Sequence, residues 1–85
     1  MKEFFFTITD EMGLHARPAG LLVKKAAGYS SEITFSVDGR TASAKRLFAI
    51  MSLCAKKGEV LHVRINGSDE ELAALELAVC LEENC

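Results

Sequence analysis

The chain has 85 residues, of which 49% are hydrophobic, and a formal net charge of −2 at pH 7. A chain of this length buries roughly 60% of its unfolded surface, which allows one core but no second domain or deep enclosed pocket. The charge argues against non-specific nucleic-acid binding, and no apolar run approaches the roughly 20 residues that span a membrane. We therefore expect one cytoplasmic domain over residues 1–85 with its chemistry at the surface.

The first third of the chain predicts one strand followed by one helix. Residues 2–9 alternate between apolar and other positions, which is the period of a half-buried strand. The side chains expected on its inner face are Phe4, Phe6 and Ile8. After a break at residues 10–13, helical spacing begins behind His15 and stops at Gly28, a candidate C-terminal cap.

The middle of the chain predicts a hairpin and a short helix. Residues 32–37 alternate again, and Asp38-Gly39 is a strong signal for a tight turn, so residues 40–43 should return antiparallel to them. A helix over about residues 46–55 follows and ends near Lys57-Gly58. Cys54 falls in this apolar stretch and is expected to pack in the core.

The last third predicts one more strand and a final helix. Residues 61–66 alternate, Asn66-Gly67 turns the chain, and residues 68–71 are expected to cap the final helix and to make its first turn acidic. The element order is then β-α-β-β-α-β-α with every strand half-buried. This order predicts an α+β fold, a four-stranded antiparallel sheet covered on one face by three helices.

The run Gly13-Leu14-His15-Ala16-Arg17-Pro18-Ala19 carries the candidate chemistry. Pro18 fits the first turn of a helix, where its missing N–H costs nothing. The free amides of Ala16 and Arg17 then point out of the helix N-terminus, where the helix dipole also favours negative charge. His15 precedes these amides, and the Arg17 guanidinium offers several donors to phosphate oxygens.

These parts fit a nucleophilic imidazole beside an anion-binding site. The ring must be neutral to attack phosphorus, and both Arg17 and the helix dipole disfavour a second positive charge, so we expect a neutral His15. Phosphoryl transfer depends mostly on positioning and charge stabilisation, so few groups are needed. A lone histidine at a helix start is also commonly a cap or a surface residue, and the spacing by itself leaves both interpretations open.

The run from Gly13 to Ala19 resembles the active-site signature of the HPr family, the histidine-containing phosphocarriers of the bacterial sugar phosphotransferase system. Residues 38–41 and 44–53 resemble the second signature of this family, and Lys57-Gly58 and residues 67–70 match as well. The resemblance covers the whole chain. It implies the fold of the family, an open-faced β-sandwich.

The same resemblance implies the function and the role of each site residue. His15 would accept a phosphoryl group on Nδ1 from the phosphoenolpyruvate-dependent Enzyme I and pass it to sugar-specific IIA domains. Arg17 would stabilise the phosphate, Ala16 would supply a backbone amide, and Pro18 would set the first-turn geometry. The protein would be a monomeric carrier with a phosphohistidine intermediate rather than a stand-alone enzyme, with no cofactor, metal or nucleic-acid partner.

Arg46 departs from the family pattern. Many Gram-positive members have a serine at this position, which a dedicated kinase phosphorylates, and Arg46 has no hydroxyl. A cation at a helix N-terminus is also unfavourable by about 0.3–1 kcal/mol, so Ser43 is the alternative cap. Ser43 and Ser52 are weak candidates for a regulatory site, and we assign no regulatory serine.

The candidate partner surface combines apolar and basic side chains on the first two helices. One short helix cannot turn all of its apolar residues inward, and exposed apolar patches with a charged rim mark contact sites. A basic rim, which Lys45 extends, would steer acidic partners to it. The candidates are Leu21, Lys24, Arg46, Leu47, Phe48 and Met51.

Three remaining features are interpreted as ordinary structure. His62 shares the outward strand face with Arg64 and is expected to be solvated. The odd cysteine count without a CxxC motif fits neither a disulfide framework nor a zinc site, so Cys80 and Cys85 are interpreted as incidental thiols. A second apolar stripe on the final helix is interpreted as surface, with weak self-association as the alternative; its residues are Leu72, Leu75 and Val79.

Two other functions compete with the relay carrier. A regulatory paralogue would report its phosphorylation state to protein partners without feeding transport. A small enzyme would use His15 as a general base on a phosphate ester, but the motif contains no second acid, base or metal ligand. Genetic context and transfer assays distinguish the first of these from a carrier.

Overall fold

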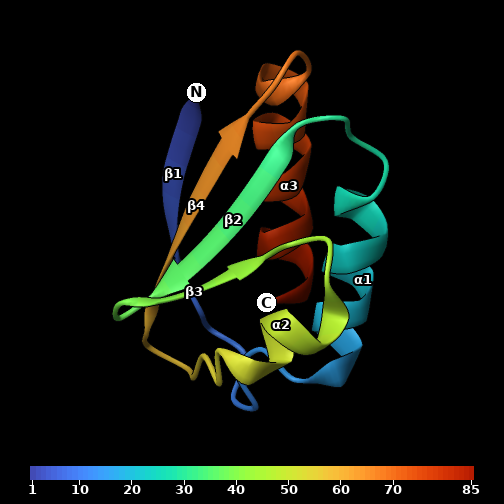
Figure 1. The fold of residues 1–85 in the computed structure, drawn as a ribbon. Helices are drawn as coiled ribbons and strands as arrows, with labels where there is room; N and C mark the ends of the chain where they lie inside the picture. The colour runs from blue at the N-terminus through green and yellow to red at the C-terminus, as the bar shows by residue number, and fades with distance from the viewer.

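The computed structural model covers residues 1–85 and has the predicted element order (Figure 1). The strands are β1 (Lys2–Thr7), β2 (Glu32–Val37), β3 (Arg40–Ser43) and β4 (Val60–Asn66), and the helices are α1 (Ala16–Ala26), α2 (Leu47–Ser52) and α3 (Glu70–Asn84). The strands form one antiparallel sheet in the order β1-β4-β2-β3. All three helices cover the same face of this sheet, and the other face is bare. The predicted fold is confirmed.

The core lies between the inner sheet face and the helices. The alternation seen in the sequence sets it, since every second residue of the central strands is buried, as at Phe35 and Val63. From the helix layer, Leu22 of α1 and Leu77 of α3 are fully buried against them. No helix is both long enough and apolar enough to cross a membrane.

Two helix ends differ from the predictions. Helix α1 ends at Ala26 with Ala27 as its C-cap, before Gly28. Helix α2 spans only Leu47–Ser52, because Cys54 adopts a left-handed backbone conformation with φ +50° that stops the helix. The predicted extension of this helix to residue 55 is therefore wrong, and Lys57-Gly58 lies in a separate turn.

The cysteines also differ from the sequence expectation. Cys54 is exposed rather than packed in the core, because its left-handed conformation turns the chain outward at the end of α2. Cys85 is buried, and burial raises the pKa of its thiol to about 11. Its backbone carbonyl accepts hydrogen bonds from the amides of Thr9 and Asp10, each at 2.8 Å, which ties the end of the chain to the segment after β1.

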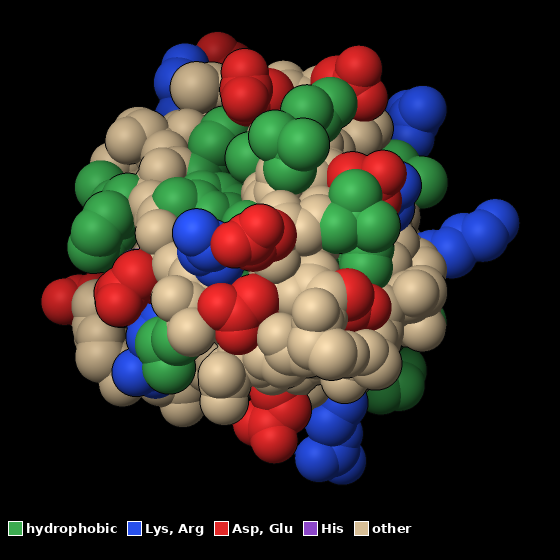
Figure 2. Space-filling view, turned by 90° about the horizontal axis from the view of Figure 1, so that it is seen from above, with side chains coloured by type: hydrophobic (Ala, Val, Ile, Leu, Met, Phe, Trp, Pro, Cys, Tyr) green, Lys and Arg blue, Asp and Glu red, His purple; other side chains and the backbone are tan.

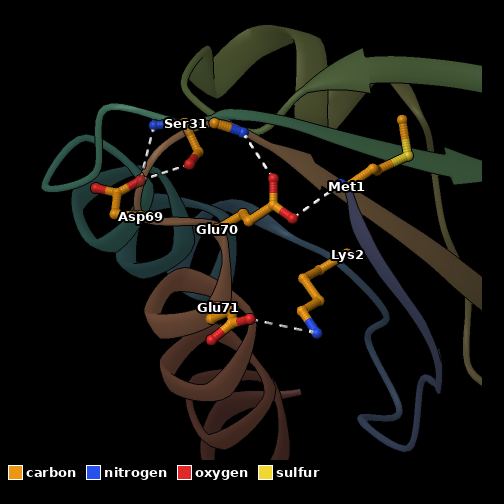
Figure 3. A network of polar contacts seen from close by, with 7 residues as sticks. Met1, Lys2, Ser31, Asp69, Glu70 and Glu71 are labelled. Atoms are coloured by element: carbon orange, nitrogen blue, oxygen red, sulfur yellow. Dashed lines mark hydrogen bonds and ion pairs between the residues drawn. The ribbon is translucent and has the colours of Figure 1, made fainter.

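A network of polar contacts joins the start of α3 to the loop after α1 and to the first residues of the chain (Figure 3). The Asp69 carboxylate accepts from the backbone amides of Ser30 and Ser31 at 2.8 and 3.0 Å and from the Ser31 hydroxyl at 2.5 Å. These bonds, the Ser31 hydroxyl first, lower the pKa of Asp69 from 3.8 to about 2. Asp69 is the N-cap residue of α3, as the sequence predicts, but its side chain forms no capping hydrogen bond because it reaches across to the loop after α1.

The acidic first turn of α3 is confirmed. Glu70 forms an ion pair with the amino group of Met1 at 2.8 Å and accepts from the Gly67 amide at 3.1 Å, and these two contacts lower the pKa of Glu70. Glu71 lies 3.8 Å from the Lys2 ammonium. Figure 2 shows this end of the molecule, with acidic side chains among apolar ones and no histidine in view.

Candidate functional site

The backbone between β1 and α1 is fixed by a close contact with the turn after α2. Gly13 has φ +67°, and a Cβ there would lie 2.3 Å from the carbonyl oxygen of Ala55. The same carbonyl accepts from the Leu14 amide at 2.8 Å. Only glycine fits this position, and the contact fixes where α1 starts.

His15 is the N-cap residue of α1 in backbone conformation, with φ −85° and ψ −174°. Its carbonyl accepts from the Ala19 amide at 3.0 Å, but its side chain forms no capping hydrogen bond. The interpretation of His15 as a side-chain cap is therefore excluded. The ring is left free at the mouth of the helix, with a side chain 30% exposed.

The first three helical residues are Ala16, Arg17 and Pro18, as the sequence predicted. The amides of Ala16 and Arg17 donate to no acceptor within the protein. Pro18 is buried in the third helical position, where an N–H would have no helical partner either. Helix α1 thus begins with free donors and with the positive end of its dipole directed at solvent.

A surface cavity of about 220 Å³ joins these groups. His15, Arg17 and Pro18 line it from the start of α1, and Glu83 and Asn84 line it from the end of α3. The Arg17 side chain is exposed and forms no ion pair within the protein, so its guanidinium remains free for a bound anion. The structure therefore brings His15, Arg17 and Pro18 together at one cavity, and Ala16 is the first residue of the same helix.

Asp10 also lines the cavity, and sequence reasoning missed it. One carboxylate oxygen, Oδ1, lies 3.9 Å from Nε2 of His15. Sequence reasoning treated residues 10–13 only as the break between strand and helix, where an acidic residue is unremarkable. The one available signal was its position five residues before His15 in a turn that ends in glycine.

The candidate partner surface divides into exposed and partly buried residues. Leu21 and Phe48 are exposed, Phe48 to 81%. Lys24 of α1 and Arg46, which directly precedes α2, are also exposed. The remaining two residues, Leu47 and Met51, are partly buried and pack against the core.

Arg46 is the N-cap residue of α2 and forms no side-chain capping bond. The alternative cap at Ser43 is also wrong, because the Ser43 hydroxyl accepts at 3.3 Å from the amide of Lys45, which precedes the helix. Lys45 instead donates its ammonium to the carbonyl of Tyr29 at 2.7 Å. Of Lys45 and Arg46, Arg46 is therefore the one whose side chain forms no hydrogen bond or ion pair within the protein.

A second, larger cavity of about 480 Å³ runs between α1 and α3. It shares the lining residues Leu21 and Asn84 with the cavity at His15, so the two cavities are neighbours. Lys24 lines it from α1.

His62 does not line the cavity at His15. It is on the bare face of the sheet as predicted, but it is not simply solvated. Its ring stacks on Phe5 with the centroids 4.4 Å apart, and Nε2 lies 2.6 Å from the Glu3 carboxylate. His62 is therefore held by its neighbours in the sheet rather than directed at a cavity.

Comparison with known proteins agrees with this geometry. The family model described as "PTS HPr component phosphorylation site" matches residues 2–83. The phosphocarrier protein HPr of Borreliella burgdorferi is 50% identical over 70 residues, covering 82% of this chain and 81% of the relative. The crystal structure of HPr from Thermoanaerobacter tengcongensis superposes with a TM-score of 0.93 at 39% identity, covering 99% of this chain and 94% of that one.

A second kind of relative has the same fold. Crh, the Bacillus subtilis catabolite repression protein, superposes with a TM-score of 0.78 at 32% identity, covering 93% of this chain and 91% of that one. Its solved structure is described as a dimer with a swapped domain.

Proposed function

The chain belongs to the HPr family of phosphocarrier proteins, and from this premise we propose that His15 accepts a phosphoryl group from the phosphoenolpyruvate-dependent Enzyme I and passes it to IIA domains in sugar uptake. The observation that carries the proposal is the free ring of His15 in one cavity with Arg17, next to the unpaired amides of α1. No other histidine of the chain is arranged in this way, because His62 is stacked and paired on the sheet.

The arrangement supports a separate role for each group in this proposal. Nδ1 of His15 is the acceptor, because Nε2 faces the Asp10 carboxylate, whose charge would repel a phosphoryl group there. The amides of Ala16 and Arg17 and the positive end of the helix dipole stabilise the phosphoryl oxygens. The Arg17 guanidinium adds charge-assisted hydrogen bonds to these oxygens. Pro18 keeps the first turn in shape.

The same region is the proposed docking surface for both partners. Leu21 lines the His15 cavity and Phe48 is exposed on the adjoining helix α2, so both offer apolar contacts, with Lys24 and Arg46 as the basic rim. Leu47 and Met51 mainly support this surface from below, since they pack against the core. Acidic rims on Enzyme I and on the IIA domain would complement it. The carrier acts as a cytoplasmic monomer that inserts into no membrane and binds no nucleic acid.

A transfer assay tests the proposal. The protein is mixed with Enzyme I and phosphoenolpyruvate, and a phosphate that is acid-labile and base-stable is expected on His15. The variant His15→Ala should abolish labelling, and His62→Ala should leave it unchanged. Labelling that survives in His15→Ala would refute the assigned acceptor.

The similarity to Crh supports a second candidate, a regulatory paralogue that signals phosphorylation state to protein partners. Adding a IIA domain to the labelled protein distinguishes the two functions, because a carrier passes its phosphate to the IIA domain and the paralogue retains it. Control through a serine kinase is closed at Arg46. A phosphate mapped to Ser43 or Ser52 after kinase treatment would favour the regulatory function.

A further inference from the structure

We propose that Asp10 is a positioning residue for phosphoryl transfer, which holds the proton of His15 on Nε2 and balances the positive charge that the ring gains as Nδ1 attacks. The inference rests on the proposed function of His15 and extends it to a residue outside the sequence motif. Its basis is the contact between Oδ1 of Asp10 and Nε2 of His15, 3.9 Å apart.

The Asp10 carboxylate is held in place from several sides. Its Oδ1 atom accepts from the Met12 amide at 2.8 Å, which ties the side chain to its own turn. Its backbone amide donates to the carbonyl of Cys85 at 2.8 Å, and its carbonyl accepts from the Gly13 amide at 2.9 Å. A carboxylate fixed in this way loses little freedom when it pairs with the ring, so it is prepared for that contact.

The separation of 3.9 Å is an electrostatic contact rather than a hydrogen bond. Contacts of this kind are often long in the resting protein and shorten when the reacting group is bound. Both side chains are about one-third exposed, at 30% for His15 and 34% for Asp10, so solvent screens the attraction without removing it. The other charged groups that line the cavity are Arg17 and Glu83.

The chemical role follows from the two ring nitrogens. A neutral imidazole has one proton, and the nitrogen that bears no proton is the nucleophile. With the proton on Nε2 facing Asp10, the lone pair is on Nδ1. This lone pair forms the bond to phosphorus while the bond from phosphorus to the donor protein breaks and its electron pair leaves with the donor. Nε2 keeps its proton, the ring becomes positive, and Asp10 faces that charge, as the carboxylate does in a Ser-His-Asp triad.

Two variants separate this role from a structural one. Asp10→Asn keeps an oxygen for the Met12 amide but removes the charge, whereas Asp10→Ala removes both. We expect both variants to slow phosphorylation of His15 about five- to tenfold, as loss of one partly screened charge at this distance implies. The control is Glu11→Gln, which removes the adjacent exposed carboxylate and should leave the rate unchanged.

The ring nitrogens give a readout that is independent of turnover. In ¹⁵N NMR spectra of the unphosphorylated protein, both Asp10 variants should show a smaller share of the His15 tautomer with its proton on Nε2, and Glu11→Gln should match the wild type. If Asp10→Asn has the wild-type rate and tautomer while Asp10→Ala is slow, Asp10 only shapes the turn and the inference is wrong. If the wild type itself is not labelled, the proposed function fails, and an unchanged tautomer in Asp10→Asn would still overturn the role of Asp10.

Discussion

The backbone amides at the start of α1 have no hydrogen-bond acceptor within the protein, whereas the amides just beyond its end do. At its start, the amides of Ala16 and Arg17 have no acceptor, and the N-cap side chain of His15 forms no bond to them. Beyond its other end, the amides of Ser30 and Ser31 both donate to the Asp69 carboxylate. Figure 1 shows these two regions at opposite ends of the molecule.

This difference separates donors that serve the fold from donors that serve a ligand. A carboxylate that accepts three hydrogen bonds fixes the loop after α1 against the start of α3, and it leaves no donor for an anion. At the start of α1 the donors have no protein acceptor, so under the proposed function they are available to a phosphoryl group that replaces water. The His15 end is therefore held by other means, through the contact of Gly13 with Ala55.

We call the start of α1, with its free amides at Ala16 and Arg17, the open end of the molecule. The largest expected effect comes from removing the Arg17 charge at this end. Arg17→Ala should slow transfer to and from His15 about 100-fold, the usual loss for one donor to a developing anion. Its free energy of unfolding should stay within about 0.5 kcal/mol of the wild type, because the exposed side chain forms no ion pair. Rapid-mixing kinetics measure the transfer rate, and urea titration measures the free energy of unfolding. If Arg17→Ala lost much stability but transferred phosphate normally, Arg17 would serve the fold rather than a ligand.

The next prediction tests whether the contact between Gly13 and the Ala55 carbonyl fixes the open end. Gly13→Ala should lower the free energy of unfolding by about 2–4 kcal/mol, because it adds both a left-handed conformation and a clash with the Ala55 carbonyl. Gly58→Ala is the matched control, since Gly58 also has a positive φ but no atom within 4 Å of its Cβ position. The control should lose only about 1–2 kcal/mol. Equal losses in urea titration would show that the contact with Ala55 does not matter.

At the opposite, closed end, the Asp69 carboxylate binds the amides of Ser30 and Ser31. This contact predicts that the free energy of unfolding depends on pH. The pKa of Asp69 is lowered from 3.8 to about 2, so its contribution to stability is present above pH 3.8 and is lost as the pH falls towards 2. Asp69→Asn should therefore lower stability at pH 7 and flatten the acid-side dependence. Ser31→Ala should lose about 1 kcal/mol at pH 7. Urea midpoints between pH 2 and 7 check both, and transfer through His15 should be unchanged in either variant.

The smallest effect is a gain in stability near the open end. Cys54→Gly should raise the free energy of unfolding by about 1 kcal/mol, because glycine adopts the φ of +50° without steric cost. Asp38→Gly is the control, with φ +48° in the hairpin, and should gain less because aspartate tolerates this conformation. Thermal unfolding measures both, and a loss of stability in Cys54→Gly would show that the thiol forms contacts that outweigh the strain.

Much of the fold is determined locally, and the sequence therefore predicts it. Side chains alternate with period two along a strand, so the inward positions of β2 and β4 and the hairpin at Asp38-Gly39 follow from patterns of a few residues. The start of α1 is equally local, because Pro18 and its preceding residues specify a first turn. The sequence alone therefore predicts His15 and Arg17 as the candidate site.

The tertiary structure decided which partners the polar side chains find. Asp69 has the sequence features of a cap for α3, but it bonds to serines 38 and 39 positions away, because folding brings that loop within reach and its amides need an acceptor. Asp10 is only five residues from His15, yet their contact depends on a turn fixed by distant segments at Ala55 and Cys85. Periodicity specifies which face a residue occupies, whereas the partner of a charge depends on segments that only the folded chain brings together.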